Sequence, residues 1–311
     1  MYTKKTTLYA KIEGTSGTDS TPTAAANAIL AHDVDLSIKA DMKERYPGNA
    51  DRSAFAEVRG KTVYELKFNI QLAGSGSAGI SPRWGCLLKS CDALETISTT
   101  PSSVTYTPAL VSTTCTIWVN IDGILHKLVG CAGEAELELP AGELPKINFT
   151  FSGVYSGLPT DSAVEAMTYD ATVPTIVKGT TTTLGAYAGI IEKFGMKTGN
   201  TIAERTSMNA SEGVLSFIVT DRKPTWSMIF EMVLMATVSA NVLSYFHSVT
   251  TKALSFVLGA TAGNITTITA PVCVIRAPKT GDREGLRTWE LEGQLARSAA
   301  AGNDEWSIKL T

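Results

Sequence analysis

Three histidines are the first residues to consider for chemistry, because imidazole serves both acid–base catalysis and metal binding. His32, His126 and His247 are the only histidines among 311 residues, and no two of them have the short spacing of a helical or hairpin metal site. A ligand set assembled from distant positions stays open as an alternative. The pattern predicts no metal, no cofactor and no catalytic residue.

The five cysteines are equally uninformative for catalysis. They are an odd number and contain no C-x-x-C pair, which argues against a disulfide framework and a structural zinc site. We expect reduced and mostly buried thiols, as in a protein synthesised in the cytoplasm. The five are Cys86, Cys91, Cys115, Cys131 and Cys273.

A glycine-rich segment, Gly74 to Gly79, partly resembles a phosphate-binding loop. It lacks the Gly-Lys-Ser/Thr ending, and the chain shows no alternation of parallel strands with helices. Ser77 falls one place late for a G-x-S-x-G nucleophile elbow. The segment is therefore interpreted as a flexible Gly-Ser linker, and an enzyme is the weakest of the functional classes considered.

One polar pattern does suggest a function. Glu134, Glu136 and Glu138 alternate with small or apolar residues, so a strand would place the three carboxylates on one face. A solvated strand face explains this pattern, and so does a surface that repels phosphate and lets DNA pass without binding. The net charge of −3 gives no global positive field that would attract nucleic acid.

The elements that carry these residues are predicted mainly as β-strands. Alternation with a period of two is typical of half-buried strands in antiparallel sheets. It recurs in Val34–Ile38, Val63–Leu72, Thr116–Ile121, Glu134–Leu139 and Lys146–Phe151. The longest apolar stretch, Trp226 to Ala240, contains polar residues and is too short to span a bilayer, so we expect a soluble protein with no membrane partner.

Two segments show helical spacing. Ser81 and Pro82 resemble a helix start, and apolar residues follow at i, i+3, i+4 and i+7; the segment from Lys223 to Val233 repeats this arrangement. Each segment is predicted as one short helix flanking the strands. The expected core anchors are Trp84, Leu87 and Leu88 in the first helix and Trp226, Ile229 and Phe230 in the second.

These two segments belong to a series of ordered matches between the halves of the chain. A glycine turn at Gly130–Gly133 matches Gly259–Gly263, and a terminal Phe149–Gly153 matches Trp289–Gly293. Their shared order indicates an internal duplication. We predict an N-terminal domain at 1–157 and a C-terminal domain at 158–311, separated by a Gly- and Pro-containing segment.

A charged excursion interrupts the strands between Asp41 and Gly60. Loops of this length in compact domains are usually functional or disordered. Its candidate contact residues are Lys43, Glu44, Arg45, Tyr46, Asp51 and Arg52. We expect this loop to reach a neighbouring subunit or ring.

With these motifs taken together, the chain resembles tail tube proteins of phages with long, non-contractile tails, in a duplicated form. The resemblance rests on the segments 82–91, 122–133, 221–226, 281–285 and 303–305. It implies two tandem tail-tube-like domains, each a β-sandwich or split barrel with one short flanking α-helix. It further implies a virion tail protein, assembled in the bacterial host cytoplasm, that forms the conduit for DNA ejection.

The resemblance also implies the partners. A duplicated subunit would form homotrimeric rings with pseudo-sixfold symmetry that stack head-to-tail. The tail tip, tape measure and tail terminator proteins would be further partners, and double-stranded DNA would pass through the lumen without specific binding.

Two rival interpretations stay open. A β-sandwich recognition module, such as an adhesin or carbohydrate-binding domain, would present exposed aromatic side chains, and Trp306 is the one tryptophan that we expect to be free. A tube subunit of a related secretion machine would share the fold, although such subunits usually have one domain.

Overall fold

The computed structural model describes residues 2, 4–234, 241–276 and 278–311. The described helices are α1 (Ala24–Asn27), α2 (Gly85–Lys89) and α3 (Val242–His247). The strands of the first half are β1 (Thr6–Ile12), β2 (Ala28–Ile29), β3 (Ala31–Lys43), β4 (Val58–Gln71), β5 (Ala93–Thr99), β6 (Ser102–Pro108), β7 (Cys115–Ile121), β8 (Ile124–Pro140) and β9 (Lys146–Tyr155). Those that follow are β10 (Thr160–Asp161), β11 (Thr181–Leu184), β12 (Ile191–Lys197), β13 (Asn200–Thr206), β14 (Val214–Arg222), β15 (Thr225–Glu231), β16 (Lys252–Leu258), β17 (Thr266–Ile275), β18 (Lys279–Arg283), β19 (Leu286–Ala296) and β20 (Ser307–Leu310).

The prediction of a mainly β fold is confirmed, and the segments predicted from alternation lie within strands, except that Leu72 follows the end of β4. The burial pattern explains why. In β9, for example, Ile147, Phe149 and Phe151 are buried while the residues between them are partly exposed, as expected for a sheet with one face against the core.

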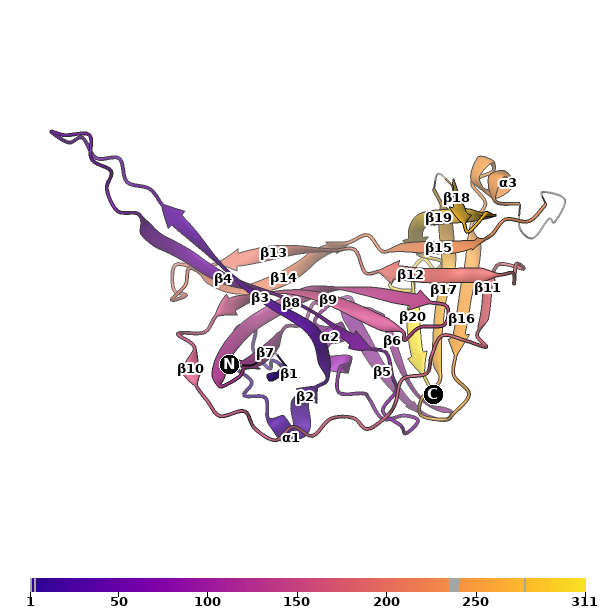
Figure 1. The fold of residues 1–311 in the computed structure, drawn as a ribbon, viewed down its shortest axis with the longest axis horizontal. Helices are drawn as coiled ribbons and strands as arrows, with labels where there is room; N and C mark the ends of the chain where they lie inside the picture. The colour runs from indigo at the N-terminus through magenta and orange to yellow at the C-terminus, as the bar shows by residue number, and fades with distance from the viewer. Residues whose placement is uncertain (1, 3, 235–240, 277) are drawn as a thin grey trace.

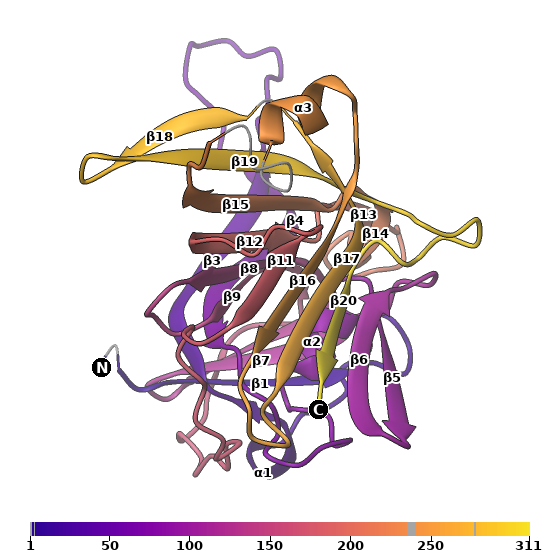
Figure 2. The same cartoon turned by 90° about the vertical axis from the view of Figure 1, so that its right-hand side faces the viewer.

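One antiparallel sheet crosses the whole molecule in the order β3-β4-β9-β8-β12-β15-β19-β18. The first four of these strands come from the N-terminal half and the last four from the C-terminal half. Figure 2 shows β8, β12, β15 and β19 stacked across the molecule. We call this the long sheet.

The two halves contribute their strands to the long sheet in the same spatial order. In the first half the strands lie side by side in the order β3-β4-β9-β8, so the last two in the chain exchange places. The second half has the matching order β12-β15-β19-β18. The division into two domains at residue 157 stays a prediction.

A second layer of strands covers one face of the long sheet. In the first half β1 pairs with β7, and β7 with the beginning of β8; in the second half β11 pairs with β16, and β16 with β17. The C-terminal strand β20 then joins β17 to β6, so the second layer also crosses between the halves. The main hydrophobic cluster accordingly contains residues from both halves.

The predicted second helix is wrong. Residues 225–231 form the strand β15, in which Trp226, Met228 and Phe230 are buried and Ile229 lies on the opposite, partly exposed face. The segment satisfies a period of two as well as the helical spacing, and pairing with β12 and β19 on both sides selects the strand. Among the residues of this half that the structure describes, the helix is α3 instead.

The first predicted helix exists but is shorter than expected. It begins at Gly85 rather than at Pro82, and Ser81 does not cap it. Its expected anchors Trp84, Leu87 and Leu88 are buried, with 6%, 0% and 1% exposure. The indole of Trp84 donates a hydrogen bond to the carbonyl of Ala73 at 2.9 Å, which ties the start of this helix to the segment that precedes it.

The predicted glycine turn at Gly130–Gly133 is also wrong, because these residues lie inside β8. The pairing of β8 with β9 shifts between Val129 and Ala132, and Gly130 has a φ of +60°. This β-bulge bends the strand, so that β8 pairs with β7 before it and with β12 after it. The matched segment Gly259–Gly263 does lie in a turn, between β16 and β17.

A buried carboxylate holds the bulge in place. Glu13 accepts hydrogen bonds from the backbone N–H groups of Gly130 at 2.7 Å and Gly17 at 2.8 Å. The hydroxyls of Thr114 and Thr116 donate to the same carboxylate at 2.7 and 2.9 Å. Four donors therefore compensate the burial of this side chain.

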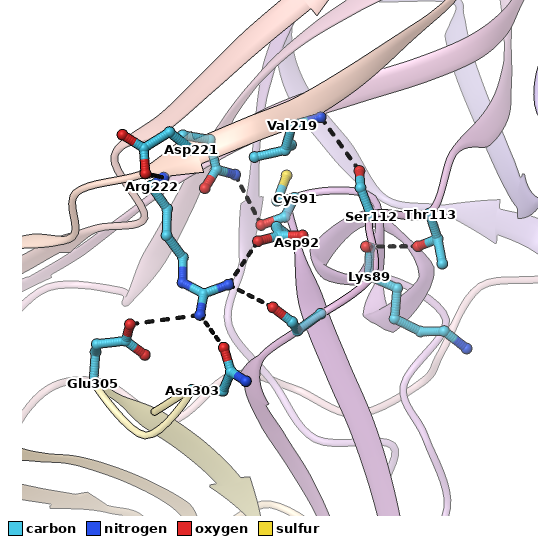
Figure 3. Close-up of polar contacts among 12 residues, drawn as sticks. Lys89, Cys91, Asp92, Ser112, Thr113, Val219, Asp221, Arg222, Asn303 and Glu305 are labelled. Atoms are coloured by element: carbon cyan, nitrogen blue, oxygen red, sulfur yellow. Dashed lines mark hydrogen bonds and ion pairs between the residues drawn. The ribbon is translucent and has the colours of Figure 1, made fainter. Parts of the chain in front are cut away.

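Polar contacts centred on Arg222, the last residue of β14, also join the halves (Figure 3). Its guanidinium donates to Asp92 at 2.8 Å and to the backbone carbonyl of Ala109, both in the first half. It also contacts Asn303 and Glu305 near the C-terminus. Burial raises the pKa of Asp92, and the neighbouring Arg222 partly offsets that rise.

Candidate functional site

The long sheet presents one continuous polar face, built from transverse rows of cross-strand neighbours. The first row runs over six strands through Gln71, Lys146, Glu138, Gly195, Ser227 and Glu292. The second runs through Asn69, Asn148, Glu136, Lys197, Thr225 and Gln294. We call the surface formed by these rows the polar face.

A third row lies between these two. Its side chains point to the opposite face of the sheet and are apolar. Its members Ile147, Leu137, Met196 and Trp226 are between 1% and 4% exposed. The inward-facing and outward-facing positions thus stay aligned from strand to strand across the junction of the halves. No change of register there turns a polar side chain inward. The long sheet consequently has a buried face and a polar face in both halves.

The three glutamates predicted to share a face do so. Ala135, Leu137 and Leu139, which alternate with them, are buried. Two of the carboxylates have lysine partners on β12: Glu134 lies 3.3 Å from Lys197, and Glu138 lies 3.3 Å from Lys193. The strand is therefore partly neutralised by its neighbour and is not a bare acidic surface.

A shallow groove of about 270 Å³ runs over the polar face where Gly195 leaves no side chain. Its lining mixes both signs of charge, with Glu138 and Glu292 near Lys193 and Arg276. Such a lining holds neither a phosphate nor a cation preferentially, because each charge has an opposite one nearby.

A long hairpin formed by β3 and β4 projects from one end of the polar face (Figure 1). The predicted excursion from Asp41 to Gly60 is a loop only between the two strands, because they extend to Lys43 and from Val58. The candidate contact residues Lys43, Glu44, Arg45, Tyr46, Asp51 and Arg52 all lie at this end and are exposed. The structure thus places them on a surface open to a neighbouring molecule.

Apolar side chains accompany the charges at the tip. Tyr46 is 86% exposed and Phe55 40% exposed, and the Arg45 guanidinium lies over the ring of Phe55 at 6.0 Å. Met42 and Val58, at the base of the loop, are also about half exposed. Exposed apolar residues gathered at a projecting tip are typical of a contact surface.

The second half has a matching hairpin that the sequence did not reveal. It consists of β13 and β14, which lie between β12 and β15 in the chain and pack against the first half, where Phe217 of β14 shares a buried cluster with Val129 of β8 and Val154 of β9. It lies beside the first hairpin, since Lys61 forms an ion pair with Glu204 at 2.6 Å and Arg59 with Glu212 at 3.7 Å. The hydrogen bond to Glu204 raises the pKa of Lys61.

The histidines are separated in the structure. They lie on β3, β8 and α3, and burial lowers the pKa of His126. In the part of the chain that the structure describes, no three His, Cys, Asp or Glu side chains are arranged to hold a metal ion. No described helix is long and apolar enough to cross a membrane.

The tryptophan predicted to be free is buried. Trp306 is 2% exposed, and it directly precedes β20, which pairs with β6 of the first half. Trp226 is equally buried. Neither side chain is available as an exposed aromatic platform for a sugar.

These features agree with a comparison against protein families. The family model described as phage tail tube protein matches residues 3–295. The chain belongs to the phage tail tube protein family. A comparison with curated proteins found no match. This tail tube protein is therefore a structural component of a phage tail, and its polar face and two hairpins are the surfaces to interpret in that context.

Proposed function

We propose that this tail tube protein forms rings that stack into the conduit for DNA ejection in a long, non-contractile tail, and that it is not an enzyme. The observation that carries the proposal is the long sheet, in which two halves with the same strand order form one continuous polar face. A subunit duplicated in this way supplies two sectors of a ring, so three copies make a ring with pseudo-sixfold symmetry.

The edges of the long sheet support ring closure. Within the described residues, β3 and β18 each pair with one strand only, so the two edges of the long sheet are open. Eight strands are an even number, and β18 of one copy would therefore meet β3 of the next in the antiparallel sense. Such closure removes the edges that would otherwise promote unspecific aggregation.

The dimensions of such a ring suit a conduit. Three copies of the eight-stranded sheet give 24 strands. Strands about 4.8 Å apart and tilted by about 40° would enclose a barrel roughly 50 Å across between backbones. A barrel of this size keeps an open channel after side chains are added, as the larger natural barrels do.

We assign the polar face, including Glu134, Glu136 and Glu138, to the lumen. DNA-binding proteins gain affinity by neutralising phosphates with Lys and Arg and releasing counterions. On the polar face Lys193 and Lys197 are already paired with carboxylates, so phosphates find few unpaired cations. DNA would pass along this surface without specific binding.

The two hairpins are assigned to contacts between stacked rings. The first hairpin projects from the long sheet and the second packs along its base. Both carry opposite charges and exposed apolar residues such as Tyr46 and Met208, a combination that gives both affinity and register. Ring-on-ring contacts leave an open end and therefore build a filament. The tail tip, tape measure and terminator proteins would act at its ends and in its interior.

The proposal is tested by measuring the assembly state of the purified protein. Sedimentation velocity at increasing concentration, with negative-stain microscopy of the same samples, should detect three-copy rings and hollow tubes. A protein that stays monomeric at every concentration, also when tail tips are added as seeds, would overturn the proposal.

A further inference from the structure

The chain contains an internal example of the contact that ring closure requires. Between its halves, β8 pairs with β12, with Glu138 opposite Gly195 and Glu136 opposite Lys197. Lys193 lies diagonally from Glu138, and their charged groups are 3.3 Å apart. We use this internal junction to infer how neighbouring copies meet, and the inference rests on the ring proposed above.

The two halves can be aligned residue by residue in the long sheet. An aromatic residue faces a glycine across β4 and β9, where Tyr64 is opposite Gly153, and across β15 and β19, where Trp226 is opposite Gly293. At Gly293 the indole of Trp226 occupies the space that a side chain would need, and at Gly153 Cys131 and Leu128 occupy it. This correspondence places Tyr64 at the position of Trp226.

Two β-bulges confirm that alignment independently. The pairing of β3 with β4 shifts immediately before Asp35, and the pairing of β12 with β15 shifts immediately before Lys193. The alignment from the aromatic pairs also places Asp35 at the position of Lys193. The segment of β3 from Asp35 to Ala40 therefore corresponds to the segment of β12 from Lys193 to Thr198.

The partner strand is aligned through β9 and β19. Phe149 on β9 is opposite Ala135, and the corresponding Trp289 on β19 is opposite Thr280. Thr280 on β18 thus corresponds to Ala135 on β8. Three residues further along the same strands, Arg283 corresponds to Glu138.

We propose that β18 of one copy pairs with β3 of the next copy in the register of the internal junction, with Arg283 opposite Ser37 and diagonal to Asp35. The internal ion pair Lys193–Glu138 is then replaced between copies by Asp35 and Arg283, with the two signs exchanged. The charges remain complementary although both residues differ.

A second pair shows the same exchange. In the internal junction Thr198 donates its backbone N–H to Ala135 at 3.0 Å, and its hydroxyl accepts from the N–H of Ala135 at 3.1 Å. The corresponding pair between copies is Ala40 and Thr280. One threonine faces one alanine in both junctions.

Burial at the open edge fits the same register. Ile38 is 54% exposed, whereas Met196 at the corresponding position is 4% exposed, so a neighbouring strand would cover an apolar side chain left open in the single copy. Charge is unfavourable at one place, since Lys39 and Lys279 take the positions of the internal ion pair Lys197–Glu134. Each of the two lysines has a carboxylate in its own copy, Glu65 and Glu292, which reduces this repulsion.

Cysteine cross-linking tests the register. In the internal junction the hydrogen bond from Thr198 to Ala135 marks a hydrogen-bonded pair. The two kinds of pair alternate along the strands, so Gly195 and Glu138, three positions away, form a non-hydrogen-bonded pair, in which opposed side chains are closest. Ser37 and Arg283 correspond to that pair. The double variant S37C/R283C, assembled and oxidised with oxidised glutathione, should give disulfide-linked dimers and trimers on a non-reducing gel. The variant K39C/R283C, shifted by two residues, is the control and should cross-link at least tenfold less.

Three outcomes count against the inference. Stronger cross-linking of the shifted variant, or rings in which neither variant cross-links, would overturn this register and leave the ring itself intact. Wild-type protein that forms no rings at all would overturn the proposed function and this inference with it.

Charge reversal tests the ion pair separately. D35R and R283D should each lower the fraction of protein in rings at least tenfold at low salt, and the double variant should recover most of it. Because Arg283 also lies 3.3 Å from Glu192 in its own copy, E192Q is the matched control and should assemble normally. Single variants that assemble like the wild type, or a double variant no better than either one, would exclude the pair.

Discussion

Replacing Arg222 by alanine gives the strongest stability prediction. The Arg222 and Asp92 side chains are 17% and 10% exposed, so the substitution leaves a buried carboxylate without its cation. Breaking a buried ion pair from one side typically costs about 3–5 kcal/mol. Because Arg222 also contacts Ala109, Asn303 and Glu305, we expect a loss of about 4 kcal/mol in the free energy of unfolding at pH 7.5.

The loss should depend on pH in a definite direction. Burial raises the pKa of Asp92, and Arg222 opposes that rise, so the Arg222→Ala variant has a still higher folded-state pKa. A group whose folded-state pKa is raised contributes stability at low pH and loses it as the pH rises through that pKa. At pH values between the folded-state pKa of Asp92 in the wild type and its higher value in the variant, the variant is less stable by an amount that depends on pH. This difference in the free energy of unfolding should shrink by about 1.4 kcal/mol per pH unit as the pH falls.

Urea unfolding followed by tryptophan fluorescence at several pH values from 5 to 8 measures both effects. Arg222→Lys keeps the charge without the planar geometry and should lose less. Arg205→Ala, at an exposed position on β13, is the matched control and should change stability by no more than about 0.5 kcal/mol. A loss below 1 kcal/mol for Arg222→Ala, unchanged between pH 8 and 5, would refute this account of the junction.

Three further predictions concern the bulge, the thiols and the hairpin. Glu13→Ala should lower the free energy of unfolding by about 3 kcal/mol in urea titrations, because the N–H of Gly130 and the other buried donors lose their acceptor; Glu13→Gln should lose less, and equal losses would contradict this. Burial raises the pKa of Cys86, and that of Cys273 to about 12, so the thiols should react with a disulfide reagent only on unfolding; fast labelling of native protein at pH 8 would contradict it. Replacing 47–55 by a short Gly-Ser turn should leave the melting temperature unchanged but prevent stacking of rings in electron micrographs; normal tubes would show that this tip is dispensable.

The sequence predicted what depends on local alternation. In β8 the alternation of Glu134, Glu136 and Glu138 with buried residues is complete, so both the strand and its two faces could be assigned. Likewise Phe149 to Gly153 and Trp289 to Gly293 occupy corresponding strands, β9 and β19.

The errors arose where neighbours decide the structure. Trp226 and Phe230 fit a helical face and a strand face equally, and only pairing with β12 and β19 settles the choice. Gly130 resembles a turn residue, yet a positive φ serves a bulge as well. Trp306 follows a polar segment, and its burial depends on β20 reaching across to β6.

The candidate site was recognised only in part, again because neighbouring strands complete it. The carboxylates of β8 were visible in the sequence, whereas their partners Lys193 and Lys197 come from β12, more than fifty positions away. No local pattern connects these strands, because the connection depends on the order of strands in the long sheet. The junction residue Arg222 was missed since its partners lie in three separate segments.

The central claim is that three copies close the long sheet into a ring with the polar face toward the channel. Cryo-electron microscopy of assembled tubes measures this directly. We predict a continuous barrel of 24 strands, from three copies of the eight-stranded sheet, with Glu134, Glu136 and Glu138 facing the lumen and the two hairpins meeting the adjacent ring. A map in which the polar face lies on the outside, or in which the ring contains a different number of copies, would contradict the account.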